Sequence, residues 1–482
     1  MDAIQKLNEA IANVISGNEI YDTYKDAWQY LLESYIGGEE YRRAEHLVRY
    51  QLETEQEYQA RLRTTPLENH CASIVSTYNS FLFRTEPMRE LGSIENLAET
   101  EDFLRDADFD GRSLNAFMKD VSTWASVFGH CWVMVSKPNI GATTRAEEVE
   151  QGVRPYLSVL TPMVVLDWSW KRMPSGRFQL DYLKYLEDVT KDIHTVKEWT
   201  PDTIRTIVVD MEDEVIREEI LEENQLGKIP AVCVYNKKGV IKGIGISDIA
   251  DIADAQRFIY NATSEIDQSI RLDSHPSLVK TPETNAGIGA GSIVHMPENL
   301  DPGLKPYILE FSGASVDKIL ESIRHTTENI DKMANTGAVR ATESRSMSGV
   351  AMETEFQLLN AKLSEKADQL ELAEENVWKL FCEYMGLSWT GEVDYPGSFN
   401  IRDTGSEIQQ LKIAAETAPN DKQIQKAIAK QVAEWMDVDY DETVEAFMPH
   451  TMTNPETGET RVAMTEAEHL QLQSQGWIHE GE

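Results

Sequence analysis

An aspartate-rich stretch in the first quarter of the chain has the spacing of a calcium-binding loop. In "DADFDGRSLNAF", four residues match the first, third, fifth and sixth positions of such a loop: Asp106, Asp108, Asp110 and Gly111. The twelfth position should supply a bidentate glutamate, but it is Phe117. Ser113 stands where a helix N-cap is expected, so we interpret the stretch as the start of a helix.

Two glycine-rich stretches are candidates for phosphate-binding loops. Residues 239–247, "GVIKGIGIS", and 285–292, "NAGIGAGS", both lack the lysine followed by serine or threonine that cradles phosphates. The first is predicted to be a strand-to-helix bend and the second a loop tip. No two histidines have the H-x-x-x-H spacing, and no G-x-S-x-G elbow occurs. We therefore predict a protein that is not an enzyme and needs no metal or other cofactor.

Composition argues against several further classes of protein. No run approaches the roughly 18 apolar residues of a membrane span, and the N-terminus lacks the pattern of a signal peptide. Four cysteines lie far apart in apolar surroundings: Cys71, Cys131, Cys233 and Cys382. They are predicted to be buried free thiols in a reducing compartment.

The chain is strongly acidic, with 82 acidic against 45 basic residues and a net charge of −37. Tight binding of nucleic acid depends on Lys and Arg, so this chain as a whole would repel DNA. Three interpretations remain: DNA contact through a few local cations, a surface that surrounds DNA without gripping it, or acidity that serves only solubility.

The first 236 residues change from helical to β-rich. Residues 20–35 place apolar and aromatic side chains at helical spacing, and Thr54 with Glu57 has the pattern of a capping box. A further helix is predicted from Ser113 to Phe128. From 129 to 236, short β-branched and aromatic runs separated by turn formers predict a β-rich domain.

Two helices are predicted on either side of a segment rich in Gly and Pro. They cover 247–274 and 315–333, and two short strands are predicted at 277–280 and 292–296 in the segment between them. Isoleucines form a narrow stripe on each helix: Ile252, Ile259, Ile266, Ile323 and Ile330. Such a stripe is typical of helices that pack side by side in a row.

A small polar stretch, "ANTGAVRATESRSMS" (334–348), follows the second of these helices and is predicted to be a loop. A long helix is expected from Gly349 to Met385, which at 1.5 Å per residue would span roughly 55 Å. Residues 387–403 suggest a returning strand. The terminal residues 404–482 are predicted to be helical, ending in a polar helix or a frayed tail.

Four stretches in this order resemble tailed-bacteriophage portal proteins. They are "YRRAEHLVRYQLETEQEYQARLRTTPLENHCASIVSTYNSFLFRTEP" (41–87), "DADFDGRSLNAFMKDVSTWASVFGHCWVMV" (106–135), "GKIPAVCVYN" (227–236) with its following helix, and "SGVAMETEF" (348–356). The chain is similar to this family over about residues 20–440. No single stretch is as specific as a nucleotide-binding motif, so the resemblance depends on their order.

The resemblance implies an α+β portal fold made of named parts. These parts are a helical and β-rich wing (1–246, completed by 349–403), a two-helix stem (247–274 and 315–333), a small β-containing clip (275–314), a channel loop (334–348) and a helical crown (404–482). It also implies a homo-oligomeric ring of twelve copies at one capsid vertex, through which double-stranded DNA is packaged and ejected.

The resemblance further implies three groups of site residues. DNA-facing residues of the channel loop would be Arg340, Thr342, Ser344 and Arg345. Clip residues that face the terminase and the head–tail adaptors would be Thr284, Asn285, Gly287, Gly289 and Gly291. The isoleucines of the stem would pack between subunits. Both arginines have a plainer interpretation as solvated cations or as partners of nearby acids such as Glu343.

The implied partners are the terminase large subunit, head–tail adaptors, and the major capsid and scaffolding proteins, with assembly in the host cytoplasm and a final place in the virion. The channel wall is expected to be mostly acidic, because a basic lining would hold the phosphates of passing DNA. The alternatives are a head–tail connector or minor capsid protein without a channel, and a monomeric metal-dependent enzyme. The enzyme would need a ligand cluster that the sequence does not display.

Overall fold

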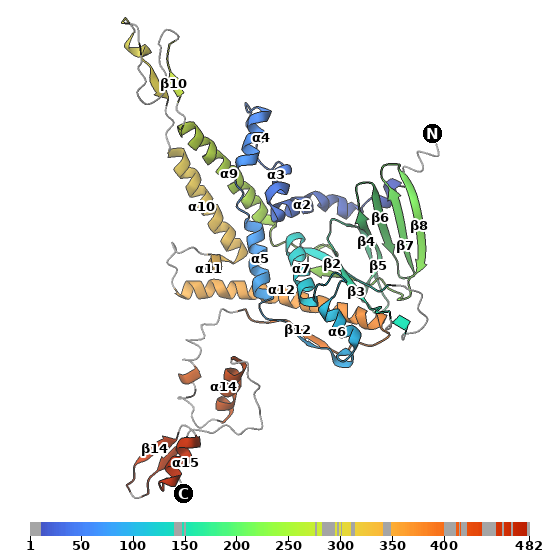
Figure 1. Cartoon of the computed structure of the whole chain (residues 1–482), viewed down its shortest axis with the longest axis vertical. Helices are drawn as coiled ribbons and strands as arrows, with labels where there is room; N and C mark the ends of the chain where they lie inside the picture. Colours follow the sequence, from blue (N-terminus) through green and yellow to red (C-terminus); the bar gives the residue numbers. More distant parts are fainter. Residues whose placement is uncertain are drawn as a thin grey trace. The chain divides into compact units, whose positions relative to one another are not determined.

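The computed structural model describes residues 11–138, 147–148, 151–274, 277–281, 295, 298–299, 301–309, 314–340, 349–399, 411–413, 415, 422–435, 450–455, 457–463 and 466–479. The chain forms two compact units, residues 1–399 and residues 400–482. The first unit contains the helical and β-rich body and the pair of helices that leads away from it (Figure 1).

Short helices build the N-terminal part of the first unit. They are α2 (Glu19–Ile36), α3 (Gly38–Arg43), α4 (Glu55–Thr64), α5 (His70–Leu82), α6 (Ala98–Arg105) and α7 (Leu114–Phe128), with β1 (Met88–Glu90) and the 3-10 turn η1 (Gly92–Ile94) between α5 and α6. The predicted capping box is confirmed: Thr54 accepts from the Glu57 amide, and Glu57 accepts from the Thr54 amide. The predicted cap of α7 is confirmed as well, since Ser113 accepts a hydrogen bond from the Ala116 amide.

In the aspartate-rich stretch before α7, backbone amides of the stretch donate hydrogen bonds to its own aspartate side chains. The Gly111 amide donates to Asp106 Oδ1 at 2.9 Å, and the Asp110 amide donates to Asp108 Oδ1 at 3.0 Å. Arg112 forms an ion pair with the other oxygen of Asp108. The stretch therefore shapes the start of a helix, as its sequence predicts.

Two antiparallel sheets form the predicted β-rich domain. One has the order β3-β2-β9, and its strands are β2 (His130–Ser136), β3 (Tyr156–Leu160) and β9 (Ala231–Tyr235). The other runs β4-β5-β6-β7-β8, and its strands are β4 (Val165–Arg172), β5 (Phe178–Val189), β6 (Ile193–Trp199), β7 (Thr203–Asp210) and β8 (Val215–Glu223). Strand β2 is buried along six of its seven residues. Strand β8 is an exposed edge rich in glutamate, which disfavours pairing with another chain.

Two helices and a small hairpin form the predicted stem and clip. Helix α9 (Ala250–Ser274) leads to β10 (Ser277–Val279), and η2 (Pro302–Leu304), β11 (Tyr307–Leu309) and α10 (Ala314–Ala334) follow. Figure 1 shows α9 and α10 side by side, with β10 beyond their far end. The strand predicted at 277–280 is confirmed as β10, which pairs with β11. The strand predicted at 292–296 lies outside the described residues except for His295.

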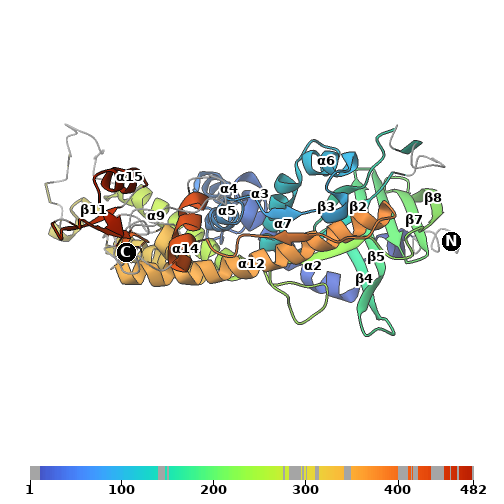
Figure 2. The same ribbon diagram turned by 90° about the horizontal axis from the view of Figure 1, so that it is seen from below.

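The stretch predicted as a loop over 334–348 is helical at its start. Helix α10 extends to Ala334, and the short helix α11 occupies Gly337–Arg340. Residues 341–348 lie outside the described residues. The long helix α12 (Gly349–Tyr384) then packs against α5, α7, β2 and β9 (Figure 2), as its 36-residue length allows.

A buried carboxylate joins α12 to the two-stranded sheet of β1 and β12 (Glu392–Asp394). Glu374 on α12 is fully buried, and both of its oxygens accept from Arg89 on β1, at 2.5 and 3.1 Å. Tyr395 donates to the same carboxylate at 2.7 Å, and the indole of Trp378 donates at 3.2 Å. Four donors to one carboxylate offset the free energy lost when the charge leaves water.

The second unit departs from the predicted helical crown. Helix α14 (Lys422–Trp435) agrees with the prediction, but the chain then forms β13 (His450–Thr453), β14 (Thr460–Ala463), α15 (Glu466–Ser474) and β15 (Ile478–His479). The strands make an antiparallel sheet in the order β14-β13-β15. Met452, Ala463, Leu472 and Trp477 form its small core. The expected polar helix is confirmed by α15, but the strands around it were not predicted, so the expectation of an all-helical crown is wrong for these residues.

We expect Arg89→Ala to lower the free energy of unfolding by about 3 kcal/mol, because Glu374 would keep a buried charge without its main partner. Arg105→Ala is the matched control: Arg105 makes an exposed ion pair with Glu101, so its loss should cost about 0.5 kcal/mol or less. Urea unfolding measures both. Equal losses in the two variants would contradict the importance of the buried pair.

Candidate functional site

The foot of the stem begins where the chain turns from β9 into α9. Gly129 follows α7 with φ +89° and lies against the backbone of Gly245, so closely that a Cβ on either residue would overlap the other chain segment. Gly243 also has a positive φ, of +90°. This confirms that the glycines of 239–247 form a bend between a strand and a helix. The Ser247 hydroxyl then donates to the Val127 carbonyl at 2.6 Å.

A buried carboxylate, Asp248, stands at this turn just before α9. Lys366 of α12 lies 2.6 Å from Asp248 Oδ2, and Lys362, one helical turn earlier, lies 3.2 Å from Oδ1. Lys366 also donates to the Ser126 hydroxyl at 2.8 Å and to the side chain of Asn236. One cluster thus joins α7, β9, α9 and α12.

The charges of this cluster support each other electrostatically. Burial would raise the pKa of Asp248, but Lys366 and Lys362 lower it to about 2. Burial acts to lower the pKa of Lys362, but Asp248 and the Tyr78 hydroxyl raise it above its ordinary value. At Lys366 burial outweighs the neighbouring Asp248, and the pKa of this lysine is lowered from its ordinary value. Asp248 is therefore an anion in the folded protein at neutral pH, with the Lys362 cation beside it and a hydrogen bond from Lys366.

The end of the second stem helix is attached to the same cluster. The Tyr78 hydroxyl on α5 accepts from Lys362 at 2.9 Å and donates to the carbonyl of Ala334 at 2.5 Å. Ala334 is the last residue of α10. The start of α9 and the end of α10 are thus held through a single chain of polar contacts that passes through α12.

Arg340, predicted to face DNA, has partners within its own chain. Its guanidinium lies 3.2 Å from Asp331 Oδ1 on α10 and 3.0 Å from His70 Nδ1 on α5. Because a guanidinium can only donate, Nδ1 must accept, and the imidazole is neutral. Burial and the nearby Arg340 lower the pKa of His70, in agreement with this tautomer. In this conformation Arg340 anchors α11 to the foot of the stem.

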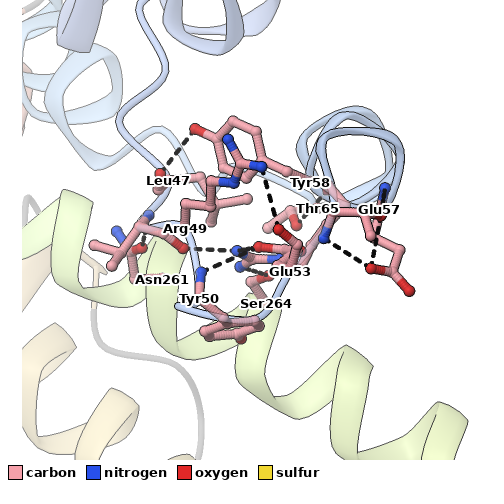
Figure 3. Close-up of polar contacts among 12 residues, drawn as sticks. Leu47, Arg49, Tyr50, Glu53, Glu57, Tyr58, Thr65, Asn261 and Ser264 are labelled. Carbon is pink, nitrogen blue, oxygen red and sulfur yellow. Dashed lines mark hydrogen bonds and ion pairs between the residues drawn. The ribbon is translucent and has the colours of Figure 1, made fainter.

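A brace formed by α3, α4 and the loop between them holds the side of α9 (Figure 3). Arg61 and Glu53 form a buried ion pair at 2.7 Å, and Arg61 also donates to Ser264 of α9 at 3.0 Å. Asn261 of α9 accepts from the Val48 amide at 2.7 Å. A small apolar cluster completes the contact: Tyr41, Leu47, Tyr58, Leu62 and Tyr260.

The isoleucines predicted to pack between subunits lie in different surroundings. Ile252, Ile259 and Ile330 are buried in the core of their own chain, with exposed fractions of 2% or less. Ile266 and Ile323 are partly buried, and Ile323 packs against the same core. The narrow stripe thus serves mainly to seat the stem on the body, and a role between subunits remains a prediction.

The other predicted site residues lie outside the described residues. In the clip these are Thr284, Asn285, Gly287, Gly289 and Gly291, and in the channel loop they are Thr342, Ser344 and Arg345. Their roles remain predictions. Within the described ranges, no helix is long and apolar enough to cross a membrane, and no group of three metal-binding side chains occurs.

Sequence reasoning missed the polar clusters at the foot of the stem. One signal was available: Lys362 and Lys366 are four residues apart on a predicted helix, among apolar positions that imply burial. Asp248 follows Ser247 at a position where a helix cap is expected, so the sequence suggests a capping role and gives no sign of the ion pairs with the two lysines. The pairing itself joins residues 118 positions apart, and local patterns do not reveal it.

The chain matches the family described as "Phage portal protein, SPP1 Gp6-like" over residues 21–439. This covers most of its length, so the chain belongs to that family of structural portal proteins. The protein is therefore a portal or connector component of a phage or phage-like particle.

Other comparisons are more distant. No curated protein matches significantly. The solved structure described as "Neck of empty GTA particle computed with C6 symmetry" is 10% identical, covers 84% of this chain and 100% of its own, and has a TM-score of 0.44. "Virion of native gene transfer agent (GTA) particle" is 11% identical, covers 83% and 98%, and has a TM-score of 0.42. This similarity is too low to assign function.

We expect the stability difference between the wild-type protein and Asp248→Asn to depend on pH. The pKa of Asp248 is lowered from 3.8 to about 2 in the folded protein, so its ionised form stabilises the fold at pH values above 3.8. This contribution to stability is lost as the pH falls toward about 2. The difference should be constant above about pH 5 and narrow by about 2 kcal/mol by pH 2. Urea unfolding at a series of pH values measures it, and a parallel shift of both proteins at every pH would contradict this assignment.

Proposed function

We propose that this protein forms the portal ring at one vertex of a phage capsid, through which double-stranded DNA is packaged and later ejected. The observation that supports this most is the family match over residues 21–439. The body followed by α9, a small hairpin and α10 agrees with a stem that carries a clip. We propose twelve copies, as the family resemblance implies.

The proposed channel wall is mostly acidic. With 82 acidic and 45 basic residues, the chain has few cations to hold phosphates along a path that DNA must traverse. Segment 341–348 would approach the channel axis, with Arg345 as a weak phosphate contact beside Thr342 and Ser344. Arg340 supports this arrangement indirectly, because its contacts with Asp331 and His70 fix the helix from which the segment departs.

The proposed partners follow from this role. The clip would dock the terminase large subunit, which would supply the ATP-driven step, and afterwards the head–tail adaptors. The body and the C-terminal unit would meet the major capsid and scaffolding proteins, with assembly in the host cytoplasm and a final place in the virion. The alternative is a head–tail connector or minor capsid protein without a DNA-translocating channel.

We expect the purified protein to form rings with a central hole. Negative-stain images should show ring-shaped top views, and the rings should bind linear duplex DNA weakly at about 0.15 M salt because the channel is acidic. Class averages and a filter-binding assay measure the two properties. Solid particles or featureless monomers would contradict a portal, and tight salt-sensitive binding would contradict an acidic channel.

Single substitutions should separate the two arginines of the proposed channel loop. Arg345→Ala should reduce DNA packaging or retention and leave the melting temperature unchanged. Arg340→Ala should lower the stability by about 1 to 2 kcal/mol, because it removes the partner of Asp331 and the donor to His70. Packaging assays in vitro and thermal melts measure both. Normal packaging by Arg345→Ala rings would favour the plainer interpretation of a solvated cation.

A further inference from the structure

A groove of about 370 Å³ lies between the two stem helices. Phe258 and Ala262 of α9 face Ile319 of α10 across it, and these apolar side chains form most of the lining surface. Four polar residues complete the lining: Asn261, Glu265, Lys318 and Ser322. Phe258 is 47% exposed, a high value for a phenylalanine on a helix that packs against another. Lys318 stands at the α10 wall of this stem groove. The described residues of the same chain leave the groove open.

The opposite face of α10 carries an apolar side chain at the same level. Lys318, Ile319 and Ser322 line the groove, and Leu320 lies within this stretch of the same helix. At 3.6 residues per turn, Leu320 points about 160° away from both Lys318 and Ser322. Its side chain is 37% exposed. The stem thus has a groove on one side and a protruding leucine at equal height on the other.

We propose that the stem groove receives Leu320 from a second copy of this chain. This rests on the proposed function, in which identical copies stand side by side around an axis along the stem. Rotation about such an axis keeps every residue at its own height, so the leucine of one copy meets the groove of the next. The contact is head-to-tail, and such contacts form a closed ring when the rotation between neighbouring copies divides a full turn evenly.

Charge supports the same pairing of faces. Asp317 is exposed and lies about 60° around α10 from Leu320, on the protruding face. Lys318 is exposed at the rim of the groove on the other face. The two residues differ in height by only about 1.5 Å, so Asp317 of one copy would meet Lys318 of its neighbour. Nothing would require an unrelated partner protein to have an acidic residue at this height.

Cross-linking tests the contact directly. The double variant Leu320→Cys with Ala262→Cys should give, under mild oxidation, a ladder of covalent oligomers on denaturing gels. Each single variant should give none, and these serve as controls for the native cysteines. A cross-link within one chain is excluded because Leu320 faces away from the groove. Absence of the ladder in rings of the double variant would overturn the proposal.

Ring formation by variants of Leu320 tests how much this contact contributes to assembly. Leu320→Asp should raise the protein concentration for half-maximal ring formation about tenfold or more. Leu221→Asp, on the exposed edge strand β8, is the matched control and should assemble like the wild type. Circular dichroism must show that both variants are folded. Mass photometry measures assembly, and equal assembly of Leu320→Asp and wild type would overturn the proposal.

Charge reversal gives an independent readout. Asp317→Lys should weaken assembly, and adding Lys318→Asp in the same chain should restore it, because each interface then regains an opposite pair. Lack of restoration would overturn the charge pairing. If the folded wild-type protein forms no rings at all, the proposed portal function and this inference both fail. If the wild type forms rings but the stem variants have no effect, only the inference fails.

Discussion

The stem of this protein depends on one buried carboxylate. Asp248 lies at the start of α9, and its side chain is buried. Lys362 and Lys366 of α12 lie beside it and stabilise its charge. Moving α12 away from α9 would leave this buried charge without its partners, which costs free energy, so the long helix stays fixed against the first stem helix. Tyr78 extends the cluster to the carbonyl at the end of α10, so both stem helices are held at one place on the body.

The chain uses several of its scarce cations inside the fold. Arg61, Arg154, Lys184 and Lys366 are all buried, although the sequence has only 45 basic residues against 82 acidic ones. Arg61, Arg154 and Lys366 each lie beside an acid, and Lys184 donates to the Asn13 carbonyl. Among the described residues, acids such as Asp108, Asp210, Asp331 and Glu374 are buried as well, so burial removes charges of both signs and the excess of acidic residues remains at the surface.

Sequence patterns predicted the parts of the fold that local rules determine. The caps at Thr54 and Ser113, the β-rich domain and the bounds of the three long helices follow from spacing and propensity within short windows. The C-terminal sheet was missed because its strands are two to four residues long and mostly polar, without a period-2 pattern. The cluster around Asp248 was missed because its members meet only after folding.

The isoleucine stripe of the stem helices also shows what sequence spacing predicts and what it does not. Its spacing correctly indicated a helix with one narrow apolar face, but spacing does not state which surface covers that face. The body of the same chain covers Ile252, Ile259 and Ile330, so burial begins at the foot of the stem. At the same level of α9, on another face, Phe258 and the stem groove remain exposed. One face of the stem helix therefore completes the core of its own chain, and another face at the same level stays open for the contact proposed above.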